Sequence, residues 1–222
     1  MKDTYQILQA KLRGAIGYRI ALNVLKDGYT FIGDNQQKCI DRHSIRLDCT
    51  KGCSHCCHFR VDARSHEILL IASFIKERWT DEDIEELKKS LVTYKEAAST
   101  LSYTEHMATN MKCPLLKNGS CSVYQVRPMG CRRHHAQDVK GCIYSYEHPN
   151  DLEFPGTKSP TLIEATGKAE NLVSYLYMIE GYDSQGYELA SSLLEAIDST
   201  KPFKRWKNKK KTFTTAIQTP KK

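Results

Sequence analysis

The sequence predicts a mainly α-helical domain with a small β-hairpin and cysteine-rich metal-binding loops. Apolar residues recur every three or four positions in several long segments, which is the spacing of amphipathic helices. An Asn118-Gly119 pair between two short runs is typical of a tight hairpin. Eight of the nine cysteines lie between residues 49 and 142. At 222 residues the chain is long enough to form a hydrophobic core without a metal.

The first predicted element is one amphipathic helix over residues 3–25. Its apolar positions are Tyr5, Leu8, Leu12, Ile16 and Ile20. Asp27-Gly28 is a turn signal and is expected to end this helix. Beyond a loop, the stretch from Ser44 to Asp48 is expected to be extended and to lead into the first cysteines.

Two further helices are predicted after these cysteines. Ser65 is expected to cap a helix that runs to Arg78 and is apolar on most sides. Thr80 is expected to cap the next helix, with Asp83 three residues later in the manner of a capping box. We expect the two helices to pack as a pair against the cysteine loop.

The C-terminal part is predicted to contain helices over residues 161–179 and 187–197, followed by a flexible basic tail. Residues 201–222 have nine cations, no acid and no apolar periodicity. Without these nine charges the net charge of +7 becomes −2 for residues 1–200, so the basic character belongs to the tail. The expected organisation is a single helical domain over residues 1–200 and a tail over residues 201–222.

The tail offers one hypothesis about a partner. Phe203, Trp206 and Phe213 alternate with cations between Lys201 and Lys222, as in segments that bind RNA or single-stranded DNA. The alternative is a solubilising chain end. Both interpretations stay open from the sequence, and no feature identifies a protein partner.

The first cysteine group indicates a metal site. Cys49, Cys53, Cys56 and Cys57 lie within nine residues, and thiolates are soft ligands that select zinc, copper(I) or iron. The N-terminus has no basic stretch followed by an apolar one, and no apolar run is long enough to span a membrane. We therefore expect a cytoplasmic protein, in which clustered thiols serve as ligands rather than as disulfides.

The second cysteine group consists of Cys113, Cys121, Cys131 and Cys142. A two-residue hairpin turn would pair Cys121 with Leu116 and place the sulfurs of Cys113 and Cys121 on opposite faces. A three-residue loop over residues 117–119 would pair Cys121 with Leu115 and place both sulfurs on one face. We favour the second register, because it would allow both sulfurs to bind the same metal ion.

Basic side chains accompany the second group. Arg127 and Arg132 are suited to offset the negative charge of several thiolates on one ion and to orient the ligands. Arg133 fits this role and a solvated loop equally well. His55, His58, His134 and His135 are further candidate ligands, because imidazole binds zinc and iron.

Together these residues resemble the YkgJ-type cysteine-cluster family. The resemblance is carried by Cys49-x3-Cys53-x2-Cys56-Cys57, by Glu67 at a helix start, and by the run from Cys113-Pro-Leu-Leu to Met-Gly-Cys131-Arg with a closing Cys142. It covers residues 48–142 and implies a zinc- or iron-chelating domain. A related domain occurs in flagellin lysine methylases, where an iron-sulfur cluster is implicated. The implied ligands are Cys49, Cys53, Cys56, Cys57, Cys113, Cys121, Cys131 and Cys142, while Cys39 lies outside the pattern.

Eight thiols exceed the ligand set of one tetrahedral zinc. They suit two zinc ions, or one [4Fe-4S] cluster with four thiols left over. Cys49, Cys53 and Cys56 also have the spacing of radical S-adenosylmethionine enzymes, but successive predicted helices disagree with the alternating strands and helices of that fold.

The sequence therefore predicts a metal-binding protein that coordinates zinc or iron through clustered cysteines. One alternative is an iron-sulfur-dependent enzyme similar to the lysine methylases. A second is a metal-stabilised nucleic-acid-binding protein that uses the basic tail. The sequence has no nucleotide-binding glycine loop, zincin motif or nucleophile elbow, so no catalytic residue is assigned.

Overall fold

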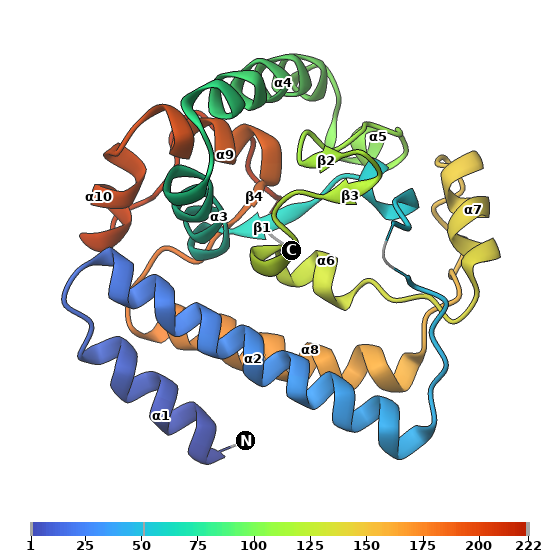
Figure 1. The fold of residues 1–222 in the computed structure, drawn as a ribbon, viewed down its shortest axis with the longest axis horizontal. Helices are drawn as coiled ribbons and strands as arrows, with labels where there is room; N and C mark the ends of the chain where they lie inside the picture. The colour runs from blue at the N-terminus through green and yellow to red at the C-terminus, as the bar shows by residue number, and fades with distance from the viewer. Residues whose placement is uncertain (1, 51, 221–222) are drawn as a thin grey trace.

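The structure is a computed structural model that describes residues 2–50 and 52–220, and helices dominate it (Figure 1). The mainly α-helical class is confirmed. The α-helices are α1 (Lys2–Arg13), α2 (Tyr18–His43), α3 (Ser65–Arg78), α4 (Asp81–Ser99), α5 (Tyr103–Met107), α6 (Met129–Arg133), α7 (Val139–Glu147), α8 (Pro160–Ile179), α9 (Leu189–Asp198) and α10 (Lys201–Lys207). Two short 3-10 helices, η1 (His55–His58) and η2 (Tyr124–Val126), and strands β1 (Asp62–Arg64), β2 (Leu116–Lys117), β3 (Ser120–Cys121) and β4 (Gly186–Glu188) complete the set. No helix among these described residues is long and apolar enough to cross a membrane.

The predicted N-terminal helix over residues 3–25 is wrong at both its middle and its end. The helix is interrupted between α1 and α2, where Gly17 has a φ of 96°. α2 then continues through Gly28 to His43. A Cβ atom at Gly28 would lie 2.9 Å from Cγ1 of Val173 on α8. Gly28 therefore permits close packing of two helices instead of ending one.

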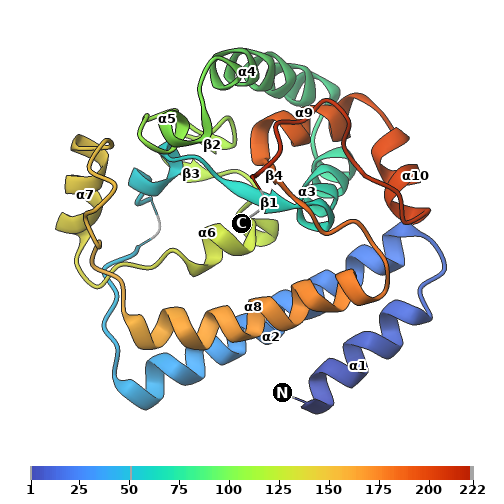
Figure 2. The same cartoon turned by 180° about the vertical axis from the view of Figure 1, so that it is seen from behind.

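α2 and α8 lie side by side and form one layer of the molecule (Figure 2). The predicted helix over residues 161–179 corresponds to α8, and Ser159 caps it by accepting a hydrogen bond from the Leu162 N–H at 3.3 Å. Above this layer in Figure 2, α3 and α9 pack together over a core that includes Leu25, Ile71, Tyr177 and Leu193. The segments that carry the cysteines are connected to the helices that pack around this core.

The helices after the first cysteine group form near the expected boundaries. Thr80 caps α4 by accepting a hydrogen bond from the Asp83 N–H at 3.2 Å, as predicted. The cap of α3 is Arg64 and not Ser65, which is already helical and fully buried. α3 and α4 both pack chiefly on α9, so they do not form a pair against the cysteine loop. α2 ends at His43, its cap residue Ser44 has a φ of 49°, and residues 45–48 that follow belong to no strand.

β1 and β4 form a small antiparallel sheet between distant parts of the chain. Asp62 pairs with Glu188 and Arg64 pairs with Gly186. The buried Glu188 side chain accepts the N–H groups of Ala190 at 2.8 Å and Ser191 at 2.7 Å, and so caps α9. This sheet connects the segment that leaves the first cysteine group to the C-terminal helices.

Residues 201–220 differ from the predicted flexible tail. Residues 201–207 form α10, and Phe203, Trp206 and Phe213 are buried in the core. The Trp206 indole N–H donates to the Asp183 carbonyl oxygen at 3.2 Å, and Gln218 forms a β-bridge with Tyr187. Burial of three large aromatic side chains provides the apolar contact that orders a segment without helical periodicity. The described C-terminal residues are therefore part of the domain.

Candidate metal centre

Two sets of backbone hydrogen bonds bring the two cysteine groups to the same end of the molecule. The Cys113 N–H donates to the Cys57 carbonyl at 2.8 Å, and the Met111 N–H donates to the His58 carbonyl at 2.7 Å. The start of the second group therefore runs beside η1, which carries Cys56 and Cys57.

The other contact joins residues 48–49 to residues 136–139. The Asp48 N–H donates to the Ala136 carbonyl at 3.0 Å, and the Val139 N–H donates to an Asp48 carboxylate oxygen at 3.1 Å. The Ala136 N–H donates to the Cys49 sulfur at 3.2 Å. α7, which carries Cys142, thereby packs against η1.

The hairpin adopts the register that the metal hypothesis disfavoured. Leu116 pairs with Cys121 and Lys117 with Ser120. Asn118 and Gly119 both have positive φ, 49° and 72°, so they form a two-residue turn. The prediction of a three-residue loop is therefore wrong.

This register does not separate Cys113 from Cys121. The strands are only two residues long, and a turn with a hydrogen bond from the Leu116 N–H to the Cys113 carbonyl at 2.9 Å precedes them. Cys113 thus lies outside the ladder, where strand alternation no longer decides the direction of its side chain. Burial raises the pKa of Cys113 to about 12, and the nearby Cys121 thiol adds to this effect.

Cys131 approaches the same sulfurs from α6. The buried Glu67 carboxylate accepts the Met129 N–H at 2.6 Å and so fixes the position of the first residue of α6. Burial is the main cause of a raised pKa at Cys131, and the Cys113, Cys56 and Cys121 thiols contribute further. Each of these thiols therefore lies within electrostatic range of the next.

Cys56 interacts electrostatically with thiols of both cysteine groups. A hydrogen bond with the Cys57 thiol, followed by burial, raises the pKa of Cys56. Burial raises the pKa of Cys142 to about 11, and the thiols of Cys49, Cys53 and Cys56 increase the shift. Burial raises the pKa of Cys49, Cys113, Cys121, Cys131 and Cys142, and the Cys56 thiol adds to the rise at each of them, so it acts on members of both cysteine groups.

Peptide N–H groups face several of these sulfurs. Burial raises the pKa of Cys113 and Cys121, while the N–H of the residue two positions later, Leu115 or Val123, lowers it. The Ala136 N–H serves Cys49 in a similar way. Such donors stabilise a thiolate relative to a thiol, as they do in metal-thiolate sites.

Arg127 supplies positive charge to the group. Burial raises the pKa of Cys121, and the Val123 N–H and then the Arg127 guanidinium counteract that rise. Arg127 has the same lowering effect on Cys49 and Cys56, after the larger causes that raise their pKa values. Its Cζ atom lies 3.7 Å from the Tyr124 ring centroid, and its buried Nε has no hydrogen-bond partner among the described residues. A half-buried cation with an unpartnered Nε donor suits a group that becomes anionic.

Arg132 faces the backbone rather than the sulfurs. Its Nη2 donates to the Gln125 carbonyl at 2.5 Å and its Nε to the Arg127 carbonyl at 3.0 Å. Its Cζ atom lies 4.1 Å from the Tyr29 ring centroid. Arg132 therefore holds the turn that presents Arg127.

Lys158 is a second cation near the cysteines that the sequence did not predict. Burial raises the pKa of Cys142, and the Lys158 ammonium is the cation that counteracts this. Lys158 is brought there by its neighbour Thr157, whose carbonyl accepts the Gln137 N–H at 2.7 Å and whose hydroxyl donates to the Asp138 carbonyl at 2.6 Å. No local signal marks this lysine, because its relation to Cys142 arises only from the return of the chain before α8.

The candidate histidines have other neighbours. His55 and His58 pack against the Tyr146 ring at centroid distances of 5.8 and 5.0 Å. His135 lies 3.3 Å from the Gln36 amide, and burial lowers the pKa of His134 to about 4. Cys39 is buried in α2, where its thiol donates to the Thr161 carbonyl at 3.8 Å.

All nine cysteines are free thiols. In the described ranges, however, no three or more His, Cys, Asp or Glu side chains are arranged closely enough to hold a metal ion as they stand. The donor set, the N–H groups at sulfur and the unpartnered Arg127 Nε fit a soft metal. The thiols converge in one region without closing around one point.

Residues 48–153 match the family model CxxCxxCC, which is described as a "Putative zinc- or iron-chelating domain". The predicted resemblance to a cysteine-cluster family is confirmed for these residues. The CxxCxxCC region extends past Cys142 and contains all eight clustered cysteines, Arg127 and Arg132. It lacks α1, α2 and α8–α10, which pack around it. No protein with a curated description and no solved structure matches the chain.

Proposed function

We propose that this protein binds zinc or iron through the eight cysteines of its CxxCxxCC region. The family describes the region as zinc- or iron-chelating. The observation that supports the residue assignment is the pairing of residues 57–58 with 111–113 and of 48–49 with 136–139, which brings the segments of the two cysteine groups next to each other. Full ligation requires the thiols to lose protons and to close around the ion when it binds.

The identity of the metal follows from the charge and number of ligands. Eight thiolates suit two zinc ions, or one [4Fe-4S] cluster that uses four of them, and Arg127 and Lys158 offset part of the negative charge in either case. Zinc would serve as a structural or regulatory ion, whereas an iron-sulfur cluster would carry electrons. Both are proposals of binding and not of a particular reaction.

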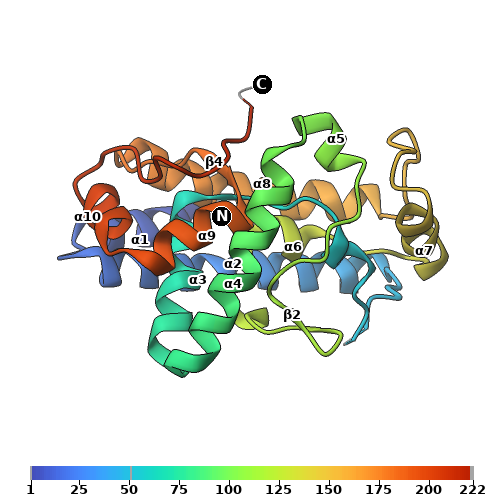
Figure 3. The ribbon, with the colours of Figure 1, turned by 90° about the horizontal axis from the view of Figure 1, so that it is seen from above.

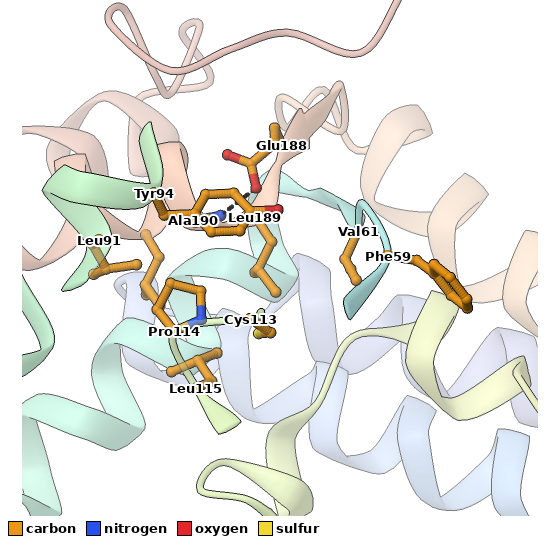
Figure 4. A pocket seen from close by; sticks show the side chains of 11 residues that line it. Phe59, Val61, Leu91, Tyr94, Cys113, Pro114, Leu115, Glu188, Leu189 and Ala190 are labelled. Carbon is orange, nitrogen blue, oxygen red and sulfur yellow. Dashed lines mark hydrogen bonds between the residues drawn. The ribbon is translucent and has the colours of Figure 1, made fainter. Parts of the chain in front are cut away.

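The alternative of an iron-sulfur enzyme that acts on a small molecule receives no support from the cavity beside Cys113. Figure 4 shows this cavity between Tyr94, Cys113 and Glu188, with apolar side chains around them. Its volume is about 10 Å³, which holds about one water molecule. A small-molecule site needs roughly 300 Å³ or more.

The experiment is elemental analysis of protein purified without oxygen, together with its absorption spectrum. Zinc in a colourless protein, or iron and sulfide with broad absorbance near roughly 400 nm, supports the proposal and identifies the metal. Protein that contains neither metal, and does not take one up when reduced and supplied with zinc or iron and sulfide, contradicts it.

Serine variants test which thiols are ligands. Cys53→Ser and Cys121→Ser are expected to lose metal and several kcal/mol of stability, because metal binding is coupled to folding. Cys39→Ser is the matched control, since Cys39 is buried outside the cluster and should retain the metal. Full metal content in both Cys53→Ser and Cys121→Ser would falsify the assignment of these residues.

A further inference from the structure

Six exposed lysines lie on the C-terminal helix and the loop that follows it. These residues, called the lysine face below, are Lys201, Lys204, Lys207, Lys209, Lys210 and Lys211. The first three are spaced at i, i+3 and i+6 on α10, so they follow one side of the helix. Figure 3 shows α10 at the end of the molecule opposite α7, which carries Cys142. The lysine face is thus separate from the proposed metal centre.

The lysine face is held on a packed support. Phe203 and Trp206 anchor α10 in the core, and Phe213 anchors the end of the loop. Between them, Arg205 donates to the Thr212 carbonyl at 2.7 Å and forms an ion pair with Glu195. The Lys210 N–H donates to the Arg205 carbonyl at 3.0 Å, which closes the loop back onto α10. These contacts fix the positions from which the lysine side chains project.

The charge of the lysine face is not neutralised within the described part of the chain. None of its six lysines has a carboxylate oxygen within 4.0 Å among residues 2–50 and 52–220, whereas Arg205 does. The Lys209 ammonium lies 5.4 Å from the Tyr182 ring centroid. A rigid array of like charges is electrostatically costly, and an external polyanion would relieve this repulsion.

The chemistry of this face favours the phosphate backbone of a double-stranded nucleic acid. Lysine is a compact point charge that contacts phosphates, and six such charges on a short element suit a dense polyanion. From Lys201 to Lys207 the helix rises about 9 Å, which spans two to three phosphates of one strand. A membrane surface fits less well, because no large apolar side chain is exposed in the described residues 201–220.

The buried aromatic residues determine which form of nucleic acid is bound. Phe203, Trp206 and Phe213 are not available to stack on bases, which is how proteins hold single strands without sequence preference. The expectation of a stacking tail for RNA or single-stranded DNA is therefore replaced. We propose that the lysine face binds duplex nucleic acid through its phosphates, without reading the base sequence.

The test is binding of the protein as purified to a fluorescent mixed-sequence duplex of about 24 base pairs, measured by anisotropy at several salt concentrations. The test variant is Lys204→Glu, Lys207→Glu and Lys210→Glu combined. The matched control is Lys26→Glu, Lys38→Glu and Lys89→Glu combined, which changes the net charge equally at exposed lysines on α2 and α4. Circular dichroism of all three proteins verifies that they are folded.

The parent and the control are expected to bind the duplex with a dissociation constant of roughly 1–100 µM near physiological salt. The lysine-face variant is expected to bind at least about tenfold more weakly. Its plot of log affinity against log salt should become shallower by about 0.9 for each lost phosphate contact.

Three results would overturn the proposal. One is equal weakening by the control variant, which indicates only a general charge effect. Another is tighter binding to the single strand of the same length than to the duplex. The last is binding to vesicles rich in phosphatidylserine with no binding to the duplex. None of these outcomes bears on the metal content, so the two proposals fail independently.

Discussion

At the scale of single residues, burial moves the pKa values of two ionisable groups away from those in water. His66 is fully buried, stacks on the Tyr177 ring at 4.3 Å, and has no partner for either ring nitrogen among the described residues. Burial lowers its pKa to about 3. Burial also raises the pKa of Glu170 to about 7, against the effect of Arg133 at 3.4 Å. Folding therefore keeps His66 neutral and favours a neutral Glu170.

Because folded His66 stays neutral, the free energy of unfolding is expected to fall as the solution becomes acidic. In the unfolded chain a histidine takes up a proton near pH 6.5, whereas folded His66 does so only near pH 3. The contribution of neutral His66 to the free energy of unfolding is thus fully present above pH 6.5. It is lost as the pH falls toward 3, by up to about 1.4 kcal/mol per pH unit. In His66→Phe, which can still stack on Tyr177, the loss between pH 6.5 and 4.5 should be smaller by roughly 2 kcal/mol. Urea denaturation at both pH values measures this, and identical losses in the two proteins would contradict it.

At the scale of elements, the glycines of α2 have two different roles. Gly28 faces α8, where an added Cβ would lie 2.9 Å from Cγ1 and 3.2 Å from Cγ2 of Val173. At Gly33 an added Cβ would meet no atom within 4 Å. The same residue type therefore serves close helix packing at one position and only adds chain entropy at the other.

Gly28→Ala and Gly33→Ala are expected to change stability in opposite directions. The first should destabilise the protein by about 1–3 kcal/mol, because the new methyl group overlaps a β-branched side chain in a packed interface. The second should stabilise it by about 0.4–1 kcal/mol, because alanine is the better helix former and has fewer unfolded conformations. Chemical denaturation of both variants checks the sign, and stabilisation by Gly28→Ala would show that α2 and α8 pack less closely than described.

At the scale of the whole molecule, the C-terminal segment completes the core that the N-terminal helices begin. The Tyr18 ring lies 5.0 Å from Phe203, and the Trp206 ring contacts Tyr182 at 4.5 Å and Tyr177 at 6.0 Å. α10 packs on α2, α3 and α9. The cysteine region is therefore carried by a scaffold built from both parts of the chain outside it.

Trp206→Ala is expected to lower the free energy of unfolding by about 3–5 kcal/mol, as for other large aromatic residues removed from a core. Lys207→Ala, its exposed neighbour, should change stability by less than about 0.5 kcal/mol. Urea or thermal denaturation distinguishes the two. A Trp206→Ala protein as stable as the parent would restore the interpretation of residues 201–220 as a flexible tail.

The sequence by itself determined the features that depend on a few neighbouring residues. These include the helical class, the Thr80 cap of α4, the turn at Asn118-Gly119 and the positions of the eight clustered cysteines. Periodicity, caps and turns are local, because the hydrogen bonds that create them join residues close in the chain.

Only the tertiary structure decided the features that depend on a distant partner. α2 continues through Gly28 because Val173 packs there, and residues 201–220 are ordered because their aromatic residues reach a core formed elsewhere. The return of the chain before α8 brought Lys158 toward Cys142. Burial and charge act between residues that are near in space, and the order of residues in the chain does not contain that distance.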